Sequence, residues 1–267
     1  MQEITAVCEK AARIGGQILL DWRGRFRVRE KGPADLVTEA DLAAQRAISS
    51  CVLEAFPDHS FLGEEDTSGV GDRTPPENSS SFCWIVDPLD GTTNYVHGLK
   101  GYCTSVALQK NEQIVAGAVY DPEADECYTA TAGQGAYLNG ERIVTSDATS
   151  LIDSLTAASF PPQVTQDSED VVAFLAVLNR CRAVRRLGSA ALNLSYVAAG
   201  RLDAYWAMRL WPWDMAAGML LVQEAGGVIT SPDGGDIDLE RPRLVAAAGP
   251  RLHQELLGVI GKDHDQR

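Results

Sequence analysis

The sequence has few of the residues that bind transition metals, and it has no long apolar run. Its four histidines form no ligand pair, and its six cysteines form no CxxC pair or zinc spacing, which argues against a zinc site or a disulfide framework. Reduced thiols in the core of a cytosolic protein are the expected alternative. No apolar run approaches the roughly 18 residues of a membrane span, and no basic segment followed by an apolar one opens the chain. We therefore expect a soluble, cytoplasmic protein with no membrane partner.

Positive charge is also scarce. The chain has 23 Lys and Arg against 37 Asp and Glu, a formal net charge of −14. Nucleic-acid binding rewards clustered Lys and Arg, so a nucleic-acid partner is not expected. An acidic protein that handles an anionic substrate needs local positive charge, which bound metal ions can supply.

The composition does allow a full core. With 267 residues and 45% hydrophobic content, the chain can fold as one large domain or two small ones. Apolar residues at helical spacing predict a first helix that ends near Trp22. Strand-like segments at 103–109, 114–120 and 126–130 are separated by turn residues, and Asn139-Gly140 predicts a hairpin. The sequence therefore predicts mixed α and β structure with much antiparallel strand.

The most informative stretch is residues 82–98. Its first five residues are apolar, which predicts a strand buried on both faces. Pro88 between Asp87 and Asp90 predicts a tight turn that ends this strand and brings both carboxylates into one small volume. Two carboxylates this close repel each other unless a cation neutralises them. Hard divalent ions such as magnesium take oxygen ligands. The Gly91-Thr92-Thr93 segment follows, where a helix could begin and backbone amides could hold a phosphate.

Other acidic residues have structural explanations as well as chemical ones. Asp41 lies three residues after Thr38, which is the spacing of a helix capping box. Glu64 and Glu65 follow a short apolar run and could be solvated loop carboxylates. Asp214 is suited to cap the helix that follows it. On the residues alone, structural and chemical roles both stay open for these acids.

Residues 84–94, WIVDPLDGTTN, resemble the signature of the inositol monophosphatase family, which are magnesium-dependent, lithium-sensitive phosphomonoesterases related to fructose bisphosphatases. Four companion segments match the family's motifs in the family's order: DLVTEAD at 35–41, GEE at 63–65, RRLGSAA at 185–191 and WDMAAG at 213–218. The resemblance implies an α/β (α+β) fold, a layered αβαβα sandwich with mixed and largely antiparallel sheets. It also implies a homodimer.

The resemblance implies roles for individual residues. Thr92, oriented by Asp41, would help take a proton from the attacking water, and with Glu64 these residues form the implied catalytic set. Two or three Mg²⁺ ions would be held by Glu64, Asp87, Asp90, Asp214 and the Leu89 carbonyl. Substrate contacts are implied for Glu64, Leu89, Asp90, Gly91, Thr92, Gly188, Ser189, Ala190 and Asp214.

The chain departs from the family pattern at Ala207. Inositol phosphatases usually carry there a Glu that hydrogen-bonds substrate hydroxyls, and an alanine cannot replace it. This loss does not affect the implied metal ligands. It therefore leaves the identity of the substrate open but does not change the implied reaction class. Arg209 and Trp211 are candidates to reshape the side of the substrate pocket where that Glu would lie, so that it accepts another anionic or ring-bearing phosphate ester.

The expected function is magnesium-dependent hydrolysis of inositol monophosphate, or of a similar small polyol or sugar phosphate, by an activated water. No covalent phosphoenzyme is expected, because no Ser, Cys or His stands in a suitable constellation. One alternative is a family relative that acts on fructose-1,6-bisphosphate, histidinol phosphate or 3′-phosphoadenosine 5′-phosphate; another is a non-catalytic interaction protein that retains the fold. A single catalytic domain is expected over residues 1–267, with a possible division into sub-lobes 1–150 and 151–267.

Overall fold

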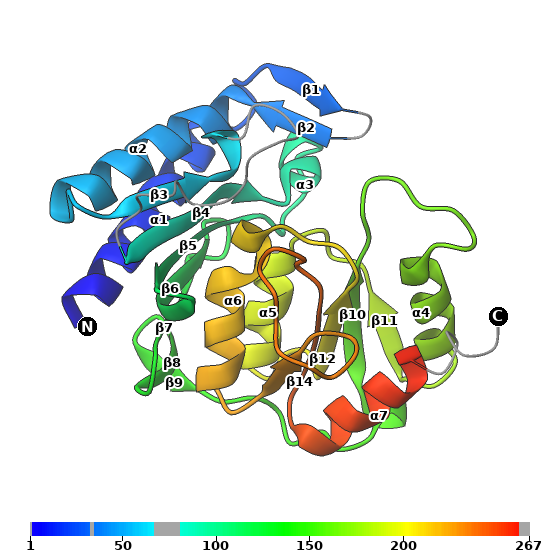
Figure 1. Cartoon of the computed structure of the whole chain (residues 1–267). Helices are drawn as coiled ribbons and strands as arrows, with labels where there is room; N and C mark the ends of the chain where they lie inside the picture. The colour runs from blue at the N-terminus through cyan, green and yellow to red at the C-terminus, as the bar shows by residue number, and fades with distance from the viewer. Residues whose placement is uncertain (1, 33–34, 67–80, 262–267) are drawn as a thin grey trace.

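The computed structural model describes residues 2–32, 35–66 and 81–261. Two sheets alternate with three layers of helices (Figure 1). From one outer face to the other, the helix layers are α1 (Gln2–Trp22) with α2 (Glu39–Ala55), α5 (Ala190–Ala198) with α6 (Pro212–Glu224), and α4 (Glu169–Leu178) with α7 (Pro250–Gly261). The predicted αβαβα sandwich is confirmed. The division of the chain into sub-lobes stays a prediction.

The first sheet lies between the α1/α2 layer and the α5/α6 layer. Its strand order is β3-β4-β5-β6-β7-β8-β9, and every pair is antiparallel except β3 with β4. The predicted hairpin at Asn139-Gly140 joins β8 to β9, and both turn residues have positive φ, 49° and 83°, as its turn type requires. The strands are β3 (Ser60–Gly63), β4 (Phe82–Asp90), β5 (Cys103–Lys110), β6 (Gln113–Asp121), β7 (Glu126–Thr131), β8 (Gly135–Leu138) and β9 (Glu141–Ile143).

The second sheet lies between the α5/α6 layer and the α4/α7 layer. Its strand order is β11-β10-β12-β14-β13, with β10 parallel to both of its neighbours and the remaining pairs antiparallel. The strands are β10 (Leu155–Ser159), β11 (Ala183–Arg185), β12 (Ala204–Ala207), β13 (Val228–Thr230) and β14 (Leu244–Ala247). Short connecting elements are the 3₁₀ turns η1 (Glu64–Asp66) and η2 (Leu151–Asp153) and the helix α3 (Thr92–Val96).

Strand β4 shows why the sheets need helices on both sides. Trp84 and Val86 pack into the core under α1 and α2, whereas Ile85 packs into the core that contains α5 and α6. A strand buried on both faces cannot alternate polar with apolar residues, which explains the continuous apolar run at its start. The prediction that this strand is buried on both faces is confirmed.

The predicted turn at Asp87-Pro88 is wrong, because β4 continues to Asp90. Asp87 pairs with Ser105 and Asp90 pairs with Cys103, so a step of three residues on β4 opposes a step of two on β5. This extra residue is a β-bulge, and Pro88 fits there because it has no N–H to give to the ladder. The bulge, rather than a turn, sets the direction of the two carboxylates.

The basic, weakly alternating residues 23–31 predict a short hairpin that leads to Gly32-Pro33, but the hairpin lies further along the chain. Strands β1 (Val28–Gly32) and β2 (Asp35–Thr38) pair antiparallel, so Gly32 belongs to the first strand of the hairpin; Pro33 lies outside the described residues. Residues 67–81, which are rich in Gly, Pro, Ser and Asn, predict a surface loop, and this segment lies almost wholly outside the described residues. Within the described ranges, no helix has both the length and the apolar character needed to cross a bilayer.

Candidate active site

Four carboxylates reach one place from three segments of the chain. Glu64 begins η1 directly after β3, Asp87 and Asp90 lie at the end of β4, and Asp214 lies in the first turn of α6. Burial raises the pKa of Asp87 well above its usual value, and the charges of Glu64, Asp90 and Asp214 raise it further. The four acids therefore form one electrostatic group, called here the carboxylate cluster.

The carboxylate cluster is held by hydrogen bonds that include its own members. Asp87 is hydrogen-bonded to Glu64 and to Asp214. In this arrangement no three acidic, cysteine or histidine side chains of the described residues form a finished metal-binding geometry. The chemistry of the donor set nevertheless fits a hard divalent cation, because all donors are oxygens and a cation removes the repulsion between buried carboxylates.

Asp90 is positioned by the start of α5. The Ser189 hydroxyl and the Ala191 backbone N–H each donate to Asp90 Oδ2 at 2.6 Å, and the Ala190 backbone also donates to this carboxylate. Burial outweighs these hydrogen bonds and raises the pKa of Asp90 to about 6. The family resemblance assigned Gly188, Ser189 and Ala190 to substrate contact, and the contact of Ser189 and Ala190 with Asp90 was missed. The substrate contact stays a prediction.

Asp214 caps α6 from inside the helix. The helix begins at Pro212, with Trp211 as N-cap, so Asp214 is the third helical residue and not the N-cap that the sequence predicted. A proline suits the first position because its missing N–H would have no partner there. Asp214 Oδ2 accepts the Trp211 backbone N–H at 2.7 Å. Burial and the charge of Asp90 raise the pKa of Asp214 well above its usual value.

Asp41 and Thr92 each have another partner in this structure. Asp41 Oδ2 accepts from the Thr38 backbone and hydroxyl, which completes the capping box of α2. Its other oxygen, Oδ1, is buried and finds no hydrogen-bond partner among the described residues. The Thr92 hydroxyl donates to the Leu89 carbonyl at 3.0 Å. Burial, with the charges of nearby Glu65 and Glu64, raises the pKa of Asp41 to about 7. The pairing of Asp41 with Thr92 stays a prediction.

Asn94 joins the two loops that carry the predicted phosphate contacts. Its Nδ2 donates to the carbonyls of Gly101 and Leu187, each at 2.7 Å. A Cβ on Gly188, whose φ is +94°, would lie 2.8 Å from the same amide nitrogen. The sequence motif contains Asn94, but nothing local to it gave the residue a role. The contact links α3 to the segment that precedes α5.

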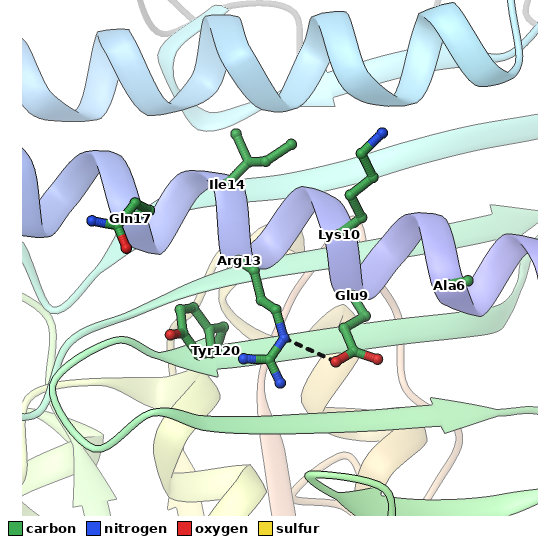
Figure 2. Close-up of a pocket in the computed structure, with 7 residues that line it drawn as sticks. All are labelled: Ala6, Glu9, Lys10, Arg13, Ile14, Gln17 and Tyr120. Atoms are coloured by element: carbon green, nitrogen blue, oxygen red, sulfur yellow. Dashed lines mark hydrogen bonds and ion pairs between the residues drawn. The ribbon is translucent and has the colours of Figure 1, made fainter.

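The groove shown in Figure 2 lies elsewhere. It has a volume of about 590 Å³ and is lined by side chains of α1 together with Tyr120 of β6, and by none of the predicted site residues. Arg13 donates to Glu9 at 2.9 Å and lies over the Tyr120 ring. Because none of the predicted site residues lines this groove, the carboxylate cluster remains the candidate site.

The raised pKa values make stability depend on pH. The unfolded chain releases its aspartate protons near pH 4, whereas folded Asp87 and Asp214 hold theirs to much higher pH. The folded state therefore binds more protons between these limits, and the stability that this contributes is lost as the pH rises. We expect the melting temperature of metal-free protein to fall between pH 6.5 and 8.5, measured by differential scanning fluorimetry. Asp87→Asn should flatten the fall, and an equal fall in both proteins would contradict the account.

Ser189→Ala should weaken the site through Asp90. Because the family resemblance implies that Asp90 is a metal ligand, loss of the 2.6 Å hydrogen bond is expected to lower turnover or metal affinity roughly 10- to 100-fold, the usual effect of removing a group that orients such a ligand. The control is Ser195→Ala, which removes a buried hydroxyl of the same helix that donates to the Ala191 carbonyl. Steady-state kinetics and metal titration should separate the two variants. Equal values for both variants would show that Asp90 does not depend on Ser189.

Comparisons with known proteins identify the family that this chain resembles over its length. Residues 1–264 match the model of the inositol monophosphatase family. Inositol monophosphatase 2 of Solanum lycopersicum is 38% identical over 98% of this chain and 99% of its own length. Nus factor SuhB of Pseudomonas aeruginosa is 38% identical over 92% of each chain. The structure of inositol monophosphatase from Anabaena (Nostoc) sp. PCC 7120 matches with a TM-score of 0.85 and 31% identity, covering 98% of this chain and 96% of that one.

Proposed function

The chain belongs to the inositol monophosphatase family, and from this premise we propose that it is a magnesium-dependent phosphomonoesterase that hydrolyses inositol monophosphate or a similar small polyol or sugar phosphate. The observation that carries the proposal is the carboxylate cluster, in which burial and three neighbouring acids raise the pKa of Asp87. Such a cluster is unfavourable in a protein with only structural needs, and it is expected where a cation is bound.

The metal-binding role is proposed for one carbonyl and the four carboxylates: Leu89, Glu64, Asp87, Asp90 and Asp214. Two or three magnesium ions held there would neutralise phosphate charge and acidify a water molecule. The Leu89 carbonyl accepts the Thr92 hydroxyl, and its second lone pair remains available for the proposed cation.

Thr92 and Asp41 are proposed to take up the proton that the attacking water loses. Asp41 Oδ1 is buried with no partner among the described residues, so it can accept a hydrogen bond at no cost to another contact. The pKa of Asp41, raised to about 7, suits a group that takes up a proton near neutral pH. The Thr92 hydroxyl would relay that proton.

The phosphate is proposed to bind between two loops. Gly91 is the N-cap of α3 and Thr92 its first residue, whereas Gly188 and Ser189 lead into α5, which begins at Ala190. Asn94 keeps these two loops at a fixed distance. Oriented backbone N–H groups stabilise phosphate oxygens, and positioning is the main task of the protein in phosphoryl transfer. Attack by water needs no covalent phosphoenzyme.

Phosphate release tests the proposal directly. The panel is inositol-1-phosphate, fructose-1,6-bisphosphate, histidinol phosphate and 3′-phosphoadenosine 5′-phosphate, each with magnesium and with magnesium plus chelator. Release of phosphate from inositol-1-phosphate that the chelator abolishes is the expected result. Release from another ester would identify one of the alternative family activities. No release from any ester would overturn the phosphatase proposal.

The second candidate is a non-catalytic interaction protein that retains the fold. It is favoured by the 38% identity to a protein named Nus factor SuhB. If none of the four esters releases phosphate and magnesium nevertheless raises the melting temperature, this candidate would be favoured. For either function we propose a cytoplasmic homodimer with no nucleic-acid or membrane partner. Light scattering coupled to gel filtration measures the oligomeric state.

A further inference from the structure

A glutamine of α2 contacts the chain on both sides of Glu64. The Oε1 atom of Gln45 accepts the Glu65 backbone N–H at 2.8 Å, and its Nε2 atom donates to Asp66 Oδ1 at 2.9 Å. On the other side, a Cβ on Gly63 would lie 2.5 Å from Gln45 Oε1, so the side-chain amide packs directly on the Gly63 backbone. Gln45 therefore holds the residues immediately before and after Glu64.

The Gln45 side chain is itself held in place. Only 6% of its surface is exposed, and it lies one helical turn after Asp41, so both side chains lie on one face of α2. The capping box formed by Thr38 and Asp41 fixes the start of this helix. The helix covers the edge of the first sheet that is formed by β3, the strand that leads to Glu64 (Figure 1). A regular helix thus carries the contacts to the chain around Glu64.

The direction of the Glu64 carboxylate depends on the main chain that Gln45 contacts. The pairing of β3 with β4 ends where Gly63 lies opposite Val86. Glu64 comes next, in the three-residue turn η1, and its carboxylate is hydrogen-bonded to Asp87. The geometry of a 3₁₀ turn is less favourable than that of an α-helix, so contacts from outside the turn help to fix it.

Both contacts need the amide group. A glutamine carries a donor and an acceptor at the end of one side chain. A glutamate could still accept the Glu65 N–H, but it would donate nothing and would place a second charge beside Asp66. A methionine has a similar length and forms neither hydrogen bond. The residue type at position 45 is therefore tied to the turn that carries Glu64.

Building on the proposed function, we propose that Gln45 is a positioning residue for Glu64, a proposed metal ligand. Its amide holds the backbone on both sides of Glu64, so that the carboxylate is directed toward Asp87. Removal of a group that orients a metal ligand typically lowers metal affinity or activity 10- to 100-fold. In this role Gln45 acts on the metal site through Glu64.

Magnesium titration of Gln45→Met tests the proposal. Calorimetry should show a dissociation constant for magnesium that is raised roughly tenfold, and kcat with inositol-1-phosphate should fall by a similar factor. Gln17→Met is the matched control, because Gln17 is a glutamine of helix α1 whose Nε2 donates to Asp21 at 3.0 Å. Both values should stay at the wild-type level in this control. Wild-type magnesium affinity in Gln45→Met would overturn the proposal.

Asp66→Ala removes one of the two hydrogen bonds at an exposed position. It should weaken magnesium binding by a smaller factor than Gln45→Met does, because the Glu65 N–H keeps its acceptor. If Gln45→Met does not fold, this variant decides the question. Magnesium affinity at the wild-type level in Asp66→Ala would then overturn the proposal.

A double variant separates positioning of Glu64 from a general effect on the structure. In a Glu64→Gln background, Gln45→Met should leave the residual magnesium affinity unchanged, because its effect passes through the Glu64 carboxylate. A further tenfold loss in the double variant would show that Gln45 acts independently of Glu64, and the proposal would be wrong.

Binding also separates this proposal from the phosphatase proposal, since calorimetry needs no turnover. Weaker magnesium binding in Gln45→Met, with no phosphate released from any ester, would support the positioning role while the phosphatase proposal alone fails. Unchanged magnesium binding would overturn the positioning role and leave the phosphatase proposal to the kinetic panel. No magnesium binding by the wild-type protein would overturn both.

Discussion

Asp87→Asn is expected to lower phosphate release by about a thousandfold and to leave the chain folded. The carboxylate of Asp87 lies at the centre of the cluster, in contact with Glu64 and Asp214. A bound metal ion stabilises transition-state charge by several kcal/mol, and about 4 kcal/mol corresponds to a factor of a thousand. An amide is a poor substitute for a ligand that carries charge. Measurement of kcat with magnesium, together with circular dichroism, gives both parts of the result.

Stability should not fall in this variant. The amide oxygen of Asn can still accept the Leu89 backbone N–H, which Asp87 accepts at 2.9 Å, and the change replaces a carboxyl group, whose charged form is disfavoured by burial and by three neighbouring acids, with a neutral group. Asp121→Asn is the matched control, because Asp121 is also a buried aspartate at the end of a strand, and its oxygen accepts the backbone N–H groups of Glu123 and Ala124. Full turnover in Asp87→Asn, or an equal loss in Asp121→Asn, would contradict the assignment.

Gly91→Ala should damage both stability and turnover. Gly91 has a φ of +94°, and a Cβ there would lie 2.8 Å from the Gly101 carbonyl oxygen and 3.1 Å from the Tyr102 Cα. The left-handed backbone costs an L-residue about 1–2 kcal/mol, and the overlap adds about 1–3 kcal/mol. A total of about 3 kcal/mol corresponds to a fall in melting temperature of roughly 10 °C for a chain of this size.

Turnover in Gly91→Ala is expected to fall about a hundredfold, because a misplacement of 1 Å at a catalytic group has effects of that order. Gly91 lies between Asp90 and Thr92, so relief of the overlap must move one of them. Gly24→Ala isolates the backbone strain, since Gly24 has a φ of +71° and its Cβ would meet no atom of the described residues within 4 Å. The melting temperature of Gly24→Ala should fall by a few degrees, and its turnover should stay at the wild-type value. Equal effects of the two substitutions would show that the contact with Gly101 is unimportant.

Local patterns in the sequence were enough to predict the elements whose causes are local. The first helix, the apolar start of β4 and the Asn139-Gly140 turn follow from residue spacing and turn chemistry. The bulge at Asp87 was missed because it depends on the register against β5. Strand β12 was not predicted, since its four residues are too few to show a period and are buried by helices on both faces.

Within the site, residue patterns alone indicated the pair Asp87 and Asp90. The convergence of Glu64 and Asp214 on that pair was expected only from the family resemblance, because no local rule relates segments so far apart. The same limit applies to the contact of Ser189 with Asp90, which joins residues 99 positions apart. Asn94 was missed as a link for the same reason, since one of its two acceptors, Leu187, lies 93 positions away.

The sequence separation of the carboxylate cluster also sets the order of events during synthesis. A ribosome adds about 5–20 residues per second, and domains fold as their parts emerge. The first sheet ends at β9 (Glu141–Ile143), so it can be complete before Ser189 and Asp214 exist. At that stage Asp90 lacks its hydrogen bond from Ser189, and Asp87 lacks the neighbouring charge of Asp214. A nascent or truncated chain that stops short of α6 therefore has every strand of the first sheet but lacks a helix that covers one face of this sheet and lacks the Asp214 carboxylate of the cluster.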